Sequence, residues 1–454
     1  MACGLIDLRS YYWFKLSDRF RWIFCQLETL RYCLPPSVRS TLKELPESLD
    51  ETYERILKEI KKPNRGHARR VLQCLVVAIR PLRVAELAEV LAVDFDDAEG
   101  IPKLNADWRW EDQEQALLIA CSSLIAVVEA EDSRVVQFSH FSVKEFLTSS
   151  RLATVGGEAS NYHIGLEPAH TTLAQACLGV LLRTHSDVDG HTPEDHPLSQ
   201  YAARHWVTHT QFADVSSRLQ NGMEYLFDPD KPHFKVWHTI YDIDTPTFTS
   251  PFFPTSQKSA AAPLYYATLC GFHDLVEHLI IKYPEDVNAS GGSYVRPLVA
   301  ALAKKHFRTA ELLRHSGADL HCHGGEMMAP LHLAAEIGDV EVIRKMIEYG
   351  VDINAKDLHG CTPLHVASDR SHHKDSSVHR FLLEHGADVN ARRVDGSTPL
   401  HNASQTGVLE VVRLLLEQGA DVKAEDNHGA TALQVAETYE SEEVKKLLLE
   451  HKAK

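Results

Sequence analysis

The sequence predicts a mostly α-helical protein whose C-terminal half is a solenoid of short helical repeats. The first observation is a Pro-Leu pair that recurs at separations of 34, 33, 33 and 36 residues, with an Ala-Leu pair 33 residues further on. The second is a series of three helix patterns followed by two short β-type runs between residues 66 and 150. We expect a helical arm at 1–65, a helix-and-hairpin domain at 66–157, a helical connector at 158–258 and the repeats at 259–454.

The composition is that of an ordinary globular protein, and the net charge argues against some classes of partner. The 454 residues are 44% apolar and 24% charged, and 47 basic against 63 acidic residues give a net charge of −16. This excess of acid disfavours binding to nucleic acid phosphates or to an anionic membrane surface. The nine cysteines form no C-x-x-C pair, and no secretory signal opens the sequence. We therefore expect buried, reduced thiols in a cytoplasmic protein, with the nucleus as the alternative location.

The first helices follow from capping signals and helical periodicity. A capping box at Ser48–Glu51 opens the helix that ends the arm. A second helix is expected over 67–80, ended by Pro81, and a third over 84–93. The inner face of the second helix is predicted to carry Val71, Leu72, Leu75, Val76 and Ile79.

A β-hairpin is predicted to follow these helices. An acidic loop over 94–111 leads into a helix that ends near Ser123. Strands are expected over 124–128 and 135–138, with a polar turn over 129–133 between them. A second capping box, Ser142 to Glu145, opens a short helix. Three helices followed by a hairpin is the order of a winged helix.

A winged helix is often a DNA reader, so DNA binding is one alternative function. Residues 66–150 contain 8 Lys and Arg against 14 Asp and Glu. The helix that would enter the groove begins Glu111-Asp112-Gln113-Glu114, whereas a DNA reader needs basic side chains there. The charge therefore argues against nucleic acid as a partner.

The repeats carry a specific signature. Thr-Pro-Leu-His occurs at 362–365 and 398–401, and Gly-Ala-Asp-Val occurs at 386–389 and 419–422. This pattern with a period near 33 resembles an ankyrin domain of six repeats over 259–454. The threonines are expected to cap the first helix of each repeat, and the prolines suit its first position. The second helices are expected to end at glycines in the left-handed conformation: Gly350, Gly386 and Gly419.

The resemblance to ankyrin domains implies a protein partner bound along hairpin tips and inner helices. The corresponding tip residues are Lys356, Asp357, Leu358, Arg392, Arg393, Val394, Glu425, Asp426 and Asn427. The corresponding inner-helix residues are Glu336, Asp369 and Gln405.

Several sequence blocks in the N-terminal half resemble one family. They include Phe20-Arg21-Trp22, Cys25–Glu28, Glu44–Leu57 and Phe138–Leu147. These blocks are similar to the region that follows the nucleotide-binding domain in fungal NACHT–ankyrin proteins, which are NOD-like receptors. The winged helix of this family is named after GPI inositol-deacylase in some catalogues. The resemblance covers nearly all of the sequence after about residue 17.

Members of that family are nucleotide-driven switches, and this sequence lacks the phosphate-binding motif. No G-x-x-x-x-G-K-[ST] loop is present, so no cofactor is expected. The alternative is a switch completed by a NACHT ATPase domain on another chain, or by one missing from a truncated gene. In that case the resemblance implies that His140, in a motif shared with Phe138 and Ser142, contacts the phosphate of bound ADP.

We expect neither an enzyme nor a metal site. The run Gly291–Val295 lacks the second glycine of the G-x-S-x-G motif that a serine lipase needs. The clusters at 321–323 and 372–373 lack the second pair of ligands of a zinc site. The predicted function is therefore a non-enzymatic signalling protein of the fungal NOD-like receptor type, which binds a protein partner through its ankyrin repeats.

Overall fold

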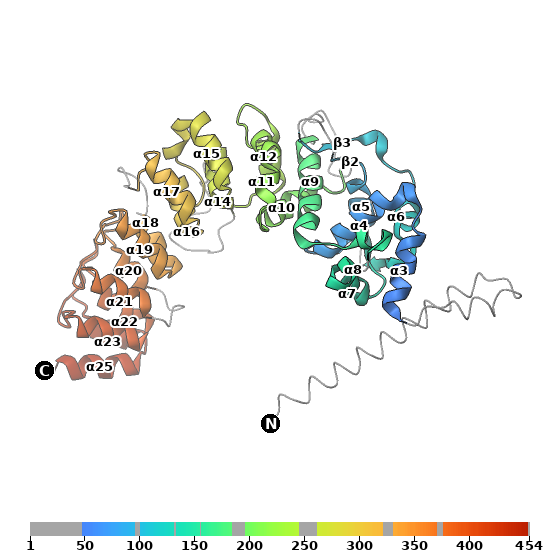
Figure 1. Ribbon diagram of the computed structural model, residues 1–454. Helices are drawn as coiled ribbons and strands as arrows, with labels where there is room; N and C mark the ends of the chain where they lie inside the picture. Colours follow the sequence, from blue (N-terminus) through green and yellow to red (C-terminus); the bar gives the residue numbers. More distant parts are fainter. Residues whose placement is uncertain are drawn as a thin grey trace, which may run out of the picture. The chain divides into compact units, whose positions relative to one another are not determined.

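The computed structural model describes residues 48–95, 100–130, 133–154, 156–183, 196–244, 261–320, 330–369 and 376–452 (Figure 1). The chain divides into two compact units, with the boundary between Ile243 and Asp244. The expected start of the repeats at residue 259 falls outside the described residues. So do most of the arm and the histidine clusters at 321–323 and 372–373.

The described part of the first unit contains the elements of a winged helix. Its helices are α3 (Leu49–Glu59), α4 (Arg65–Val77), α5 (Val84–Val90) and α6 (Gln113–Cys121). Strands β1 (Leu82–Arg83), β4 (Ile125–Ala130) and β5 (Ser133–Phe138) form an antiparallel sheet in the order β1-β5-β4. A second, two-stranded sheet pairs β2 (Val93–Asp94) with β3 (Lys103–Leu104). The predicted fold class, mostly helical with one small hairpin, is confirmed.

Three predicted bounds in this domain are wrong. Helix α4 ends at Val77, and Ala78 is already extended at φ −57° and ψ 133°. The helix ends before Arg80 because a residue that precedes proline disfavours the helical conformation. As a result, Ile79 is 48% exposed instead of facing inward. Helix α5 ends at Val90, and Val93 pairs with Leu104 in β2 and β3. The strands of the hairpin run through most of the expected turn, where Ala130 pairs with Ser133.

After the hairpin, the described residues of the first unit are mostly helical, as predicted. The α-helices are α7 (Phe141–Thr148), α8 (Ser150–Thr154), α9 (Leu166–Arg183), α10 (Ser199–Thr210), α11 (Val215–Arg218), α12 (Gln220–Leu226) and α13 (His233–Ile240). Trp206 and Trp237 meet edge to face, with ring centroids 5.4 Å apart, and the Trp237 indole donates to the Ala203 carbonyl. These buried rings join α10 to α13.

A buried polar chain links the connector helices to the end of α4. The Ile79 N–H donates to the Tyr201 hydroxyl at 3.2 Å, and that hydroxyl lies 2.9 Å from Nε2 of His209. Nδ1 of His209 lies 2.9 Å from Nδ1 of His170. Burial, followed by the neighbouring His170 and His205, lowers the pKa of His209 to about 3. The His209 imidazole is therefore neutral at pH 7.

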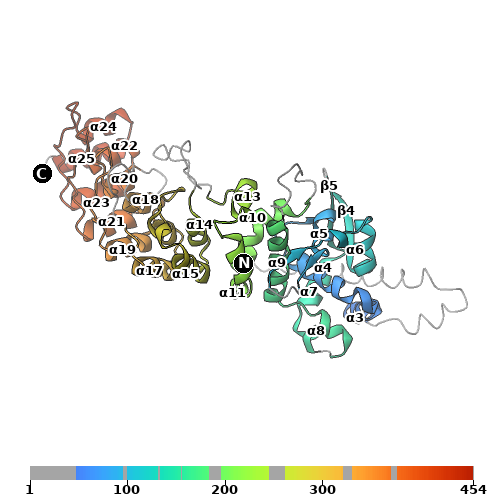
Figure 2. The ribbon, with the colours of Figure 1, turned by 90° about the horizontal axis from the view of Figure 1, so that it is seen from above.

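The second unit contains six helix pairs within its described residues, as the repeat pattern predicts (Figures 1 and 2). The first helices are α14 (Pro263–Cys270), α16 (Pro297–Ala303), α18 (Pro330–Ile337), α20 (Pro363–Ser368), α22 (Pro399–Thr406) and α24 (Ala432–Thr438). Their partners are α15 (His273–Lys282), α17 (Phe307–His315), α19 (Val340–Glu348), α21 (Ser377–Glu384), α23 (Leu409–Glu417) and α25 (Glu442–Lys452). Each first helix begins at the predicted residue, because proline suits the first helical position and Ala432 continues the period.

Glycines end the second helices of the repeats. Gly350, Gly386 and Gly419 have φ values of 89°, 96° and 87°, so the predicted left-handed conformation is confirmed. Asparagine side chains of the preceding repeats bond to two of these corners, those at Gly386 and Gly419. Asn354 donates to the Gly386 carbonyl at 3.1 Å and accepts the Asp388 N–H at 2.8 Å. Each asparagine therefore fastens one repeat to its successor.

Candidate protein-binding surface of the repeat array

Three hairpins contain the residues predicted to lie at the tips. They are closed by backbone hydrogen bonds from Asp357 to Cys361, from Arg393 to Ser397 and from Asp426 to Ala430, at 3.0, 3.1 and 2.9 Å. The turns contain Gly360, Gly396 and Gly429, all with positive φ. The predicted tip residues therefore occupy equivalent places in three successive repeats.

Hydrogen bonds tie neighbouring hairpins together. The Val394 N–H donates to the His359 carbonyl, and the Asn427 N–H donates to the Asp395 carbonyl, each at 2.9 Å. Lys356 Nζ donates to the Arg392 carbonyl at 3.2 Å, and the Arg392 guanidinium donates to the Glu425 carbonyl. Two of the predicted binding residues, Lys356 and Arg392, thus also hold the surface in shape.

The tips of the first two of these hairpins combine exposed apolar side chains with positive charge. Leu358 is 58% exposed and Val394 is 73% exposed. Lys356 and Arg392 are exposed beside them, and in the described part of the chain neither forms an ion pair with a carboxylate. The third tip is acidic, with Glu425 and Asp426.

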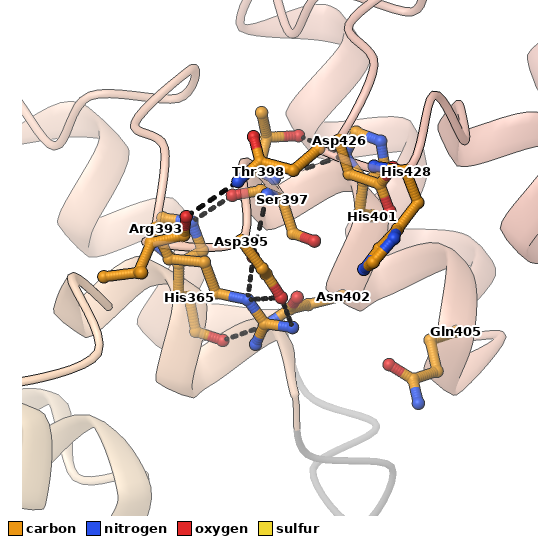
Figure 3. A network of polar contacts seen from close by, with 12 residues as sticks. His365, Arg393, Asp395, Ser397, Thr398, His401, Asn402, Gln405, Asp426 and His428 are labelled. Carbon is orange, nitrogen blue, oxygen red and sulfur yellow. Dashed lines mark hydrogen bonds and ion pairs between the residues drawn. The ribbon is translucent and has the colours of Figure 1, made fainter.

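The middle hairpin has a positive residue where the hairpins on either side have an aspartate. Figure 3 shows this residue, Arg393, and the aspartate of the following hairpin, Asp426. Asp357 and Asp426 each accept two backbone N–H bonds within their own turns, and Arg393 stands at the equivalent position. Asp395, two residues later, takes over the acceptor role: it accepts the Ser397 N–H at 2.9 Å and pairs with Arg393 at 2.7 Å. Burial opposes ionisation of Asp395, but the bonds from Arg393 and Ser397 outweigh it and lower its pKa to about 2.

Histidines of the inner helices support the hairpins from beneath (Figure 3). Nδ1 of His365 lies 2.8 Å from the Thr362 hydroxyl, and its Nε2 lies 3.2 Å from the Ser397 carbonyl of the next hairpin. His401 repeats this arrangement with Thr398 and Ala430. Burial is the main cause that lowers the pKa of His365, to about 4. These histidines are therefore neutral structural groups at pH 7.

The inner-helix residues predicted to bind a partner differ in accessibility. Gln405 is exposed, and its amide donates to the Tyr439 hydroxyl at 2.9 Å. Asp369 is partly buried, which raises its pKa, although the charge of Arg393 opposes the shift. Glu336 is only 2% exposed, so the prediction that its side chain faces a partner is wrong.

His140 lies in the first unit, on a site of a different kind. Its imidazole caps α7: Nδ1 accepts the Ser142 N–H at 3.3 Å and lies 2.6 Å from the Ser142 hydroxyl. That hydroxyl also contacts the phenol of Tyr53 on α3 at 2.8 Å. The predicted capping box at Ser142–Glu145 is therefore wrong, since His140 is the cap and Ser142 is buried inside the helix.

Other expected features concern thiols, metals and membranes. Cys74, Cys121, Cys177, Cys270 and Cys361 are buried, as predicted. No group of three or more metal-ligating side chains occurs among the residues that the structure describes. Over the same residues, no helix has both the length and the apolar character needed to cross a membrane.

Comparisons with known proteins identify both domain types. Residues 297–393 and 371–454 match ankyrin repeats, and residues 53–163 match the winged helix domain of GPI inositol-deacylase. The chain therefore contains ankyrin repeats and a winged helix domain of the GPI inositol-deacylase type. The second match begins at Tyr53, in the helix expected to belong to the arm. Tyr53 packs against Phe146 of α7, with ring centroids 5.5 Å apart.

Curated relatives share parts of this chain. Azaphilone pigments biosynthesis cluster protein L of Monascus ruber is 30% identical over 295 residues, or 62% of this chain and 61% of the relative. Ankyrin repeat and SOCS box protein 5 of Oryctolagus cuniculus is 34% identical over 110 residues, or 24% of this chain and 33% of the relative. The ARF GTPase-activating protein Git of Drosophila melanogaster is 33% identical over 93 residues, or 19% and 13% of the two chains. The chain thus spans less than two thirds of each relative, and its ankyrin repeats indicate a role in protein interaction.

Proposed function

We propose that the chain is a non-enzymatic signalling protein of the fungal NOD-like receptor type, acting in the cytoplasm by binding a protein partner through its ankyrin hairpins. The winged helix match and the sequence blocks around Tyr53 and His140 support the receptor type. The ankyrin repeats support the mode of binding. We place the partner on the tip residues and on the exposed inner-helix residue Gln405.

One observation carries the proposal: Leu358 and Val394 are exposed apolar side chains on adjacent hairpins that are tied together. Exposed leucine or valine alone is ordinary on a protein surface. Here, however, the Val394 N–H is bonded to the His359 carbonyl, so both side chains stand on a preorganised surface. Such a surface binds without the entropic cost of ordering loops.

The test uses the full chain in its native cell. In the double variant Leu358→Asp and Val394→Asp, both backbones keep their hydrogen bonds while the apolar surface gains charge. Proximity labelling should recover a partner with the wild type and lose it with this variant. The matched control is Ile281→Asp on α15, a residue that is 77% exposed away from the hairpins. Equal labelling by all three chains would contradict the proposal.

A second candidate function is a nucleotide-dependent switch completed by a NACHT ATPase domain on another chain. The specific observation in its favour is that His140 is a partly exposed imidazole at the start of α7, as the resemblance requires. The test is ADP binding by calorimetry with a NACHT domain added. His140→Asn should keep a cap on α7 but weaken ADP binding, whereas unchanged binding would reject this function. DNA binding gains no such support, because α6 contains no lysine or arginine.

A further inference from the structure

A surface cavity in the first unit lies beside two exposed tryptophans. It has a volume of about 560 Å³, within the range of ligand-binding pockets. Trp108 and Trp110 are each 47% exposed at its edge. The cavity is lined by His67, Leu91, Asp107, Trp108, Arg109 and Trp110. Tryptophan is among the residues that contribute most of the binding energy at protein interfaces, so this exposed pair indicates a binding site.

The residue between the tryptophans fixes their position. Arg109 has an extended backbone, at φ −70° and ψ 135°, which places the side chains of its two neighbours on the opposite side of the chain. Its guanidinium bonds to the buried carboxylate of Glu89 and lies 3.0 Å from Nδ1 of His196. The other oxygen of Glu89 accepts the Leu198 N–H at 2.7 Å, just before α10. The tryptophans therefore stand on an anchored segment.

The exposed charged side chains next to the tryptophans are acidic. Asp107 lines the cavity, and Glu111 and Asp112 directly follow Trp110 in the sequence. In the described ranges no lysine or arginine forms an ion pair with any of the three. Arg109 does not offset this charge, because Glu89 neutralises it. Asp112 accepts the backbone N–H of Gln115 at 2.9 Å, and Asp107 and Glu111 are exposed.

His67 adds a neutral polar group to the lining. Its Nδ1 is buried and has no hydrogen-bond partner among the described residues. Burial and the nearby charge of Arg70 lower the pKa of His67, so the imidazole does not repel a cation at pH 7. Arg70 itself lies over the Phe95 ring, 4.4 Å from its centroid.

We propose that this cavity binds a lysine or arginine side chain of a partner protein, at a site separate from the ankyrin repeats. The indole face attracts cations more strongly than the other aromatic side chains do, and Asp107 and Glu111 supply complementary charge. A hydrophobic partner without charge would leave these carboxylates uncompensated, and an acidic partner would be repelled. The proposal is independent of the function assigned to the hairpins.

The test measures binding of synthetic peptides to the full chain. The probes are a decapeptide of alternating lysine and serine, and its counterpart with glutamate in place of lysine. Acrylamide quenching of tryptophan fluorescence provides the readout in a chain that carries Trp13→Phe and Trp22→Phe. Of the four tryptophans that remain, Trp108 and Trp110 are exposed whereas Trp206 and Trp237 are buried. The lysine peptide should reduce quenching, and raising the salt concentration should weaken its binding. Absence of binding, or equal binding of the glutamate peptide, would overturn the proposal.

Variants separate the two features of the site. Trp108→Ala with Trp110→Ala should weaken binding of the lysine peptide at least about tenfold when binding is measured by calorimetry. Asp107→Asn with Glu111→Gln should weaken it several-fold and reduce its salt dependence. Ile119→Ala, at a 53% exposed residue of the same domain, is the matched control and should bind like the wild type. If the tryptophan variant also binds like the wild type and remains folded by circular dichroism, the cavity is not the site.

Discussion

The amide oxygen of Asn390 lies 2.8 Å from the backbone nitrogen of Asp421 in the next repeat and accepts its hydrogen bond. The same side chain donates to the Gly419 carbonyl at 3.1 Å, so it satisfies two backbone groups at the corner where α23 ends. Asn354 and Asn288 make equivalent pairs of bonds in earlier repeats. The asparagine therefore belongs to the interface between repeats.

We expect Asn390→Ala to lower the free energy of unfolding of the repeats by about 1–2 kcal/mol, because two hydrogen bonds are lost. Urea unfolding followed by circular dichroism measures the change. Lys423 occupies the same position in the last repeat, where no further described repeat follows, so Lys423→Ala is the control and should change stability by less than about 0.5 kcal/mol. Equal losses in the two variants would show that Asn390 does not join the repeats.

Acid should destabilise the connector helices through His209. Its pKa is about 3 in the folded chain, below the value of about 6.5 expected after unfolding. The unfolded state therefore binds more protons between these values, and the free energy of unfolding falls as the pH drops from 7 to 4. His209→Gln should be less stable at pH 7 but show a shallower pH dependence. Fluorescence of the buried Trp206 and Trp237 reports the transition, and an unchanged slope would contradict the assignment.

The Arg393–Asp395 pair should stabilise the middle hairpin unequally. Asp395→Ala removes the acceptor of the Ser397 N–H as well as the ion pair, and we expect a loss of about 1–2 kcal/mol. Arg393→Ala leaves the bond to Ser397 in place and should cost less than about 1 kcal/mol, because the pair is partly exposed. Thermal unfolding of the two variants gives this order, and the reverse order would place the stabilisation in the arginine.

Tyr53 should couple α3 to the winged helix. Tyr53→Phe keeps the ring against Phe146 but removes the bond to Ser142, which is buried, so we expect a loss of about 1–2 kcal/mol. Tyr225→Phe, at a 36% exposed tyrosine of the same unit, serves as the control and should be nearly neutral. Hydrogen exchange of α3 should increase in the first variant only. If exchange there stays the same, the hydroxyl does not hold α3 in place.

Local signals in the sequence predict much of this fold. Proline at a first helical position is a backbone effect, so the starts of the first helices follow from residues such as Pro363 and Pro399 alone. Glycine after a second helix is equally local, and Gly386 behaves as expected. The end of α4 is harder to predict from the sequence. Ile79 fits the helical period, and only the following Arg80-Pro81 pair indicates that the helix ends earlier.

The surface is harder to predict, because accessibility depends on packing between segments distant in sequence. The residues next to Glu336 in the sequence do not indicate that it is buried, and those next to Trp108 do not indicate that it is exposed. The role of Asp395 could have been found by aligning the hairpins, since Arg393 breaks the pattern set by Asp357 and Asp426. The capping role of His140 could not have been predicted in this way, because histidine is an unusual capping residue.

Two series of hydrogen bonds join successive repeats, one made by histidines and one by asparagines. The last repeat lacks the residues that would continue either series. Where the earlier repeats carry His365 and His401, it carries Gln434, which bonds Thr431 within the same repeat. Where they carry Asn354 and Asn390, it carries Lys423. A duplicated copy of the α22–α23 repeat would therefore join smoothly if inserted inside the array, but not if attached after α25. Lengthening the protein at that end would first require Gln434→His and Lys423→Asn.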